Sequence, residues 1–262
     1  MTEQAFGSPI AGPASFRFGD MLKRSFDIFG RHFLLLFILL AVLMTPTLYL
    51  QIQVNRYTPQ IIAELAKTGT FANTDFLWTL LYGWLGTIVG QTIAHALVTV
   101  LAFQALSGRP VDLGEGVGRL LARLLPYLAM LILVFLAVVF SMLLLIIPGI
   151  IVAMIFAVAQ PVCLIEKLGP IASLSRSAAL TKGNRWVIFA AYLVYGLVGG
   201  GAGAILRAII GRLATPEMAI YVSYPVSVAV AAFGAVMAVA IYAELRLVKE
   251  GGDTGRLASV FD

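Results

Sequence analysis

Charged residues are scarce in this sequence. Asp, Glu, Lys and Arg make up only 12% of its 262 residues, while 60% are hydrophobic. A soluble globular protein carries roughly 25% charged residues. A soluble fold of this size could not hide so much apolar surface and still present a solvated exterior. The composition therefore indicates an integral membrane protein.

Cysteine and histidine are nearly absent as well. The single Cys163 excludes an intramolecular disulfide, and with only His32 and His95 beside it a metal cluster is not expected. The catalytic motifs HExxH and GxSxG and the P-loop are missing, and no span contains a pair of acidic residues. We therefore predict no catalytic centre, no metal site and no cofactor.

Long hydrophobic runs are what the sequence does contain. About 20 helical residues cross a hydrocarbon core of about 30 Å. We predict an all-α bundle with spans at residues 33–50, 76–103, 126–147, 149–165, 186–206 and 219–243. The third and fourth stretches are joined without a charge, at a turn indicated by Pro148 and Gly149. They are either two full spans or a re-entrant pair, and the sequence leaves both open.

Lysine and arginine are distributed unevenly between the two predicted sides of the membrane. Of the 18 cations, only those at 56, 67, 207 and 212 lie on one side, and the remaining fourteen lie on the other. The positive-inside rule therefore predicts that both termini are cytoplasmic. We expect a disordered lead at residues 1–15, one membrane domain at 16–250 and a C-terminal tail at 251–262.

Three short amphipathic segments each precede an odd-numbered span. In residues 16–33, 113–128 and 170–182, apolar residues recur on one helical face, and the basic residues lie outside it. We predict three interfacial helices, whose apolar faces lie in the headgroup boundary. The chain then reads as a threefold pseudo-repeat of interfacial helix, span and return span.

The basic residues of these segments have two interpretations. They are orientation anchors only, or Arg24, Arg119, Arg176 and Lys182 converge to cradle an anionic headgroup. The predicted partners are membrane lipids with anionic headgroups on the cytoplasmic face, together with a membrane protein or a second copy of the chain. Nucleic acid is not an expected partner.

The second span carries the densest set of intramembrane polar residues. Gln91 and His95 are four residues apart and share a helical face. Because polar groups are costly in lipid, they are candidates for a proton- or substrate-binding pair facing the bundle interior. The alternative is interhelical hydrogen bonding beside the small-residue row Gly86, Gly90 and Ala94.

Three stretches resemble a bacterial membrane family. They are GDMLKRSFDIFGRHF (19–33), the run from Ile147 to Phe189, and YAELRLVKEG (242–251). They are similar to YciC-like inner-membrane proteins and to the membrane domain of glycerophosphoryl diester phosphodiesterases. The resemblance implies a six-span protein of the bacterial inner membrane. Hydrolysis in the fused members belongs to a separate soluble domain, which we do not expect here.

The sequence thus predicts a structural or accessory component of the bacterial cytoplasmic membrane that contacts lipid or a partner. The alternative is a transporter or lipid-handling protein with an intramembrane cavity near Gln91 and His95. A polar cavity lined by both residues would favour the alternative. A bundle packed tightly by small residues, with apolar grooves on its outside, would favour the accessory role.

Overall fold

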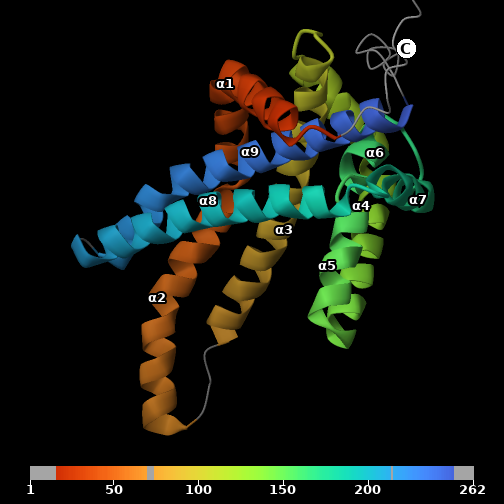
Figure 1. Ribbon diagram of the computed structural model, residues 1–262. Helices are drawn as coiled ribbons and strands as arrows, with labels where there is room; N and C mark the ends of the chain where they lie inside the picture. The colour runs from red at the N-terminus through yellow and green to blue at the C-terminus, as the bar shows by residue number, and fades with distance from the viewer. Residues whose placement is uncertain (1–15, 70–73, 214, 251–262) are drawn as a thin grey trace, which may run out of the picture.

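The computed structural model describes residues 16–69, 74–213 and 215–250, and within these ranges all regular structure is helical. The helices are α1 (Phe18–Leu43), α2 (Thr45–Thr68), α3 (Thr74–Leu106), α4 (Leu113–Leu144), α5 (Ile146–Ile155), α6 (Ala159–Ile165), α7 (Pro170–Thr181), α8 (Arg185–Leu213) and α9 (Pro216–Glu250) (Figure 1). The all-α prediction is confirmed for this part of the chain. The predicted N-terminal lead and C-terminal tail lie outside the described residues.

Six helical segments of the described chain are long and apolar enough to cross a membrane. They are α1, α3, α4, the α5–α6 pair, α8 and α9, with mean hydropathies from 1.6 to 2.8 over 18 residues. This number confirms the prediction of six apolar segments of spanning length, as a multi-pass membrane protein requires. Four of the predicted ranges each fall inside one of these segments. The third, 126–147, extends three residues beyond the end of α4 at Leu144, and the first, 33–50, is divided between two helices.

The first predicted span, residues 33–50, is divided between two helices. α1 ends at Leu43 and α2 begins at Thr45. Pro46 lies in the first turn of α2, where its missing amide needs no helical partner, so it starts a helix instead of continuing one. α2 then runs to Thr68, well beyond the predicted end at residue 50.

The predicted interfacial segments differ in how they join the spans. Residues 113–128 are part of α4, which continues through Pro126, so this segment and the third span form one continuous helix. A continuous helix keeps most backbone groups paired, which matters where water is scarce, although Pro126 itself donates no hydrogen bond. In α1, by contrast, the helix kinks at His32 (φ −114°, ψ 15°). α7 is a separate helix.

The second halves of α3 and α9 form the centre of the described core. All residues of 96–104 and of 239–245 are buried, and a helix buried all round is an interior element. α9 packs against α1, α8 and α3, while α4 and α5 pack against each other as a hairpin. Figure 1 shows α8 running beside α9, with the α2–α3 pair and the α4–α5 hairpin leaving the centre separately.

Glycines of α3 allow close contact with the break between α1 and α2. A Cβ atom at Gly83 would lie 2.5 Å from Leu50, and one at Gly86 would lie 3.1 Å from Pro46. A Cβ atom at Gly90 would collide with the carbonyl oxygen of Leu43. The predicted packing role of Gly86 and Gly90 is therefore confirmed.

Candidate functional site

Two of the cations predicted to bind a headgroup already face glutamates. Arg24 Nη1 lies 3.5 Å from Glu244 Oε2, and the Glu244 residue is only 6% exposed. Arg119 donates to Glu115 Oε1 at 3.0 Å, within the first turns of α4. A buried carboxylate is costly without a charge partner. The contact with Arg24 therefore serves to hold α1 against α9.

Arg176 belongs to a closed ring of polar contacts that ties α7 to α6 and α9. It donates to Glu166 Oε2 at 3.0 Å and also pairs with Glu250. Tyr242 donates to Glu166 Oε1 at 2.9 Å and accepts from Arg246 at 3.3 Å, and Arg246 donates to Glu250 Oε2 at 2.8 Å. Burial alone would lower the pKa of Arg176, but its hydrogen bonds to Glu250 and Glu166 outweigh burial and raise the pKa.

Lys182 is the fourth cation of the predicted cradle. It follows the last residue of α7 and is exposed. Three of the four predicted headgroup ligands, Arg24, Arg119 and Arg176, have carboxylate partners inside the protein. Their charges are therefore already compensated, which weakens the hypothesis of a common cradle and favours a role in holding helices together.

The hydroxyl face of α7 covers the break between α5 and α6, which the sequence analysis did not predict. Ser177 donates to the carbonyl oxygen of Ile155 at 2.8 Å, and Thr181 donates to the same oxygen at 3.3 Å. Both residues are fully buried, while Ile171, at a different angular position on the helix, is 76% exposed. The two side chains thus satisfy a carbonyl at the end of α5, where the regular helix is interrupted.

An apolar groove of about 420 Å³ lies between α5 and the first turns of α8. Ile147, Ile150, Ile151, Met154 and Phe189 supply its apolar lining. Arg185 and Trp186 complete the lining. The Nε atom of Arg185 is buried without a hydrogen-bond partner in the described chain. Trp186 is 75% exposed. The groove therefore combines an apolar trough with a cation and an indole at one end.

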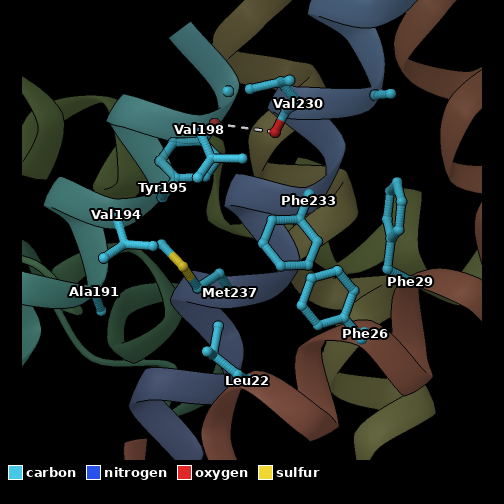
Figure 2. A pocket seen from close by; sticks show the side chains of 12 residues that line it. Leu22, Phe26, Phe29, Ala191, Val194, Tyr195, Val198, Val230, Phe233 and Met237 are labelled. Carbon is cyan, nitrogen blue, oxygen red and sulfur yellow. Dashed lines mark hydrogen bonds between the residues drawn. The ribbon is translucent and has the colours of Figure 1, made fainter. Parts of the chain in front are cut away.

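A second apolar groove, of about 330 Å³, lies between α1, α8 and α9. Figure 2 shows Phe26, Phe29 and Phe233 gathered on one side of it, opposite Val194 and Tyr195. The ring of Phe233 lies 4.8 Å from that of Phe26 and 5.5 Å from that of Phe29, between centroids. Such outward apolar grooves are the feature expected of the accessory role.

A polar cavity of about 640 Å³ lies between α2, α3, α8 and α9. α2 lines it with a polar stripe at helical spacing, Thr47, Gln51, Asn55 and Thr58. α3 contributes Thr87 and Gln91, and α8 contributes Arg207. The side-chain amide of Gln91 donates to Thr47 at 3.4 Å, so this candidate residue does face a polar space.

His95 is not among the described lining residues of that cavity, so of the two candidates the described cavity includes only Gln91. His95 is half-buried one turn farther along α3, where the helix enters the central core. Within the described residues, no cluster of three His, Cys, Asp or Glu side chains could hold a metal ion.

Comparisons of the chain with protein-family models, with curated proteins and with solved structures found no match. The resemblance to YciC-like proteins therefore stays a prediction. The function has to be argued from the grooves and the cavity described above.

Proposed function

We propose that the chain is a multi-pass protein of the bacterial cytoplasmic membrane, with both termini in the cytoplasm, that binds anionic lipid as an accessory component. No catalytic centre is part of this proposal. The uneven distribution of lysine and arginine supports the orientation. The threefold unit of interfacial helix, span and return span also remains part of the proposal, with the part of α1 before the kink at His32, the start of α4, and α7 as its interfacial elements.

The groove beside Arg185 is the observation that carries this function. A guanidinium nitrogen that is buried without a partner leaves a donor unsatisfied, which costs about 1–3 kcal/mol. A lipid phosphate is a suitable partner for the Arg185 side chain, because arginine presents several donors in a fork that matches phosphate oxygens. The apolar trough would receive the acyl chain, and Trp186 has the amphipathic ring typical of the membrane interface.

Native mass spectrometry of the detergent-extracted protein tests the proposal. Arg185→Gln should release one bound phosphatidylglycerol per chain and weaken its binding about tenfold, as expected for loss of a hydrogen bond to a charged group. The control is Arg31→Gln, which removes the same charge from an exposed position on the same predicted side. Equal lipid retention by the two variants would contradict the proposal. The same spectra report retained subunits, and so test for a partner protein or a second copy.

A second candidate function is the handling of a small molecule or lipid in the polar cavity. The cavity lined by Gln91, Thr87 and Arg207 supports it, although His95 does not contribute. Intramembrane polar residues that line a cavity are rare and usually functional. The cavity lies beside Arg207, on the side of the chain predicted to be extracytoplasmic, whereas Arg185 lies at the start of α8, which is predicted to be cytoplasmic. The two functions therefore use separate sites.

A further inference from the structure

Arg207 is the only charged side chain among the described residues that line the polar cavity. Its Nε donates to the carbonyl oxygen of Gly203, in its own helix, at 3.3 Å. Glu217, at the start of α9, pairs instead with Arg56, whose Nε lies 3.0 Å from Glu217 Oε1. The cavity therefore presents a positive charge that the described lining does not neutralise, and this favours an anionic ligand.

Thr87 provides an independent indication of a polar ligand in the cavity. The residue is only 7% exposed, and its hydroxyl is buried without a hydrogen-bond partner in the described chain. Helical threonines usually donate to a carbonyl one turn earlier. Thr58 does so to Val54 at 2.6 Å and Thr99 does so to His95 at 2.8 Å. Thr87 is one of the residues that line the cavity, so rotation of its side chain would bring the hydroxyl to a ligand oxygen that can accept its proton.

The remaining lining defines the rest of the ligand. Gln51 and Asn55 add side-chain amides, which can donate to further oxygens. Leu50, Trp84 and Ile220 form apolar walls. We propose that the cavity binds an organic anion whose phosphate or carboxylate group is held by Arg207 and Thr87. This inference rests on the second function proposed above and assigns its ligand class.

Two sources could supply such a group, the headgroup of an anionic lipid or a small soluble organic phosphate. Binding to the full-length protein in neutral detergent would be measured with phosphatidylglycerol in one arm and with glycerol phosphate in the other. All variants would also carry Arg185→Gln, so that lipid in the other groove does not contribute. Binding in the first arm alone identifies a lipid headgroup, and binding in the second shows that the free anion is sufficient. Either result supports the proposal.

Variants of the two ligand-binding residues give the decisive comparison. Arg207→Gln should weaken binding about 10- to 100-fold, and Thr87→Val about tenfold, as expected for hydrogen bonds to a charged group. The matched control is Arg212→Gln, an exposed cation five positions along the same helix and not part of the described lining, which should change binding less than about twofold. Thermal unfolding of each variant would establish that it folds.

A variant that fills the cavity distinguishes failure of the assigned ligand class from failure of the proposed cavity function. Asn55→Trp would occupy the cavity without changing its charge. If Arg207→Gln binds both ligands as tightly as Arg212→Gln, while Asn55→Trp abolishes binding, the assigned role of Arg207 is overturned and the cavity function stands. If Asn55→Trp also leaves binding unchanged, or if neither ligand binds, both are overturned.

Discussion

Replacing Ser177 by alanine tests how the protein maintains the break between α5 and α6. At the end of α5, the amide of Ala159 donates to Phe156 at 3.0 Å and not to Ile155, as a continuous helix would require. The carbonyl oxygen of Ile155 accepts instead from the hydroxyls of Ser177 at 2.8 Å and Thr181 at 3.3 Å. Both hydroxyl groups belong to fully buried residues, so water cannot readily replace them.

The expected cost follows from these two contacts. Interhelical hydrogen bonds in membrane proteins contribute about 0.6 kcal/mol on average and up to about 1.7 kcal/mol. Ser177→Ala removes the shorter bond and should lower the free energy of unfolding by about 1 kcal/mol. The double variant with Thr181→Val leaves the carbonyl without either hydroxyl donor, which adds a desolvation penalty of about 1–3 kcal/mol. Its total effect should be about 2–4 kcal/mol, more than the sum of the single changes.

Equilibrium unfolding in mixed micelles, followed by circular dichroism, would measure these differences. Ser173→Ala is the matched control, because Ser173 is also fully buried on α7 and donates to the carbonyl oxygen of Gly169 at 2.8 Å. That oxygen keeps a second donor, the amide of Ser173 itself at 2.9 Å, so the control should cost less than about 0.5 kcal/mol. If Ser177→Ala and Ser173→Ala unfold alike, and the double variant is simply additive, the reasoning is refuted.

Two further predictions concern packing and orientation. Gly90→Ala should lower the free energy of unfolding by about 1–3 kcal/mol, because its Cβ atom would collide with the backbone oxygen of Leu43. In the same unfolding titration Gly196→Ala, which has open space around it, should change stability by less than about 0.5 kcal/mol, and equal effects would contradict the close packing. Cysteines placed at the exposed positions of Lys67 and Lys182 should react with a membrane-impermeant maleimide from opposite compartments. Reaction of both from one compartment would overturn the proposed topology.

Much of the helical organisation could be predicted because the thickness of the bilayer sets the length of a spanning helix. The ends of helices were harder to predict from the sequence, since the effect of a proline on a helix depends on its surroundings. Pro46 begins a new helix, whereas Pro126 and Pro225 lie inside continuous ones. Local sequence shows in each case that an amide is missing. It does not show whether the neighbouring carbonyl groups find other partners, and this decides whether a helix ends or continues.

The candidate site was predicted only in part. Gln91 lines a polar cavity as the alternative hypothesis required, but His95 belongs to the neighbouring core region. Arg185 and Arg207 were missed as ligand candidates. Each had a signal in the sequence, since Arg185 precedes Trp186 at the start of a predicted span and Arg207 is one of only four cations on its predicted side. Neither signal says whether a carboxylate lies nearby, because such partners can come from any part of the chain, as Glu244 does for Arg24.

The sequence by itself determined which segments are apolar enough to enter a membrane, where small residues permit close packing, and on which predicted side the cations gather. The tertiary structure decided which face of each helix meets protein and which remains outside. In α7 the serine and threonine face is buried, and Ile171 is exposed. The reason is that lipid tails are as apolar as a protein core, so hydrophobicity cannot distinguish the two environments. The distinction depends on polar contacts and close packing between segments distant in the chain, and these exist only once the helices have assembled.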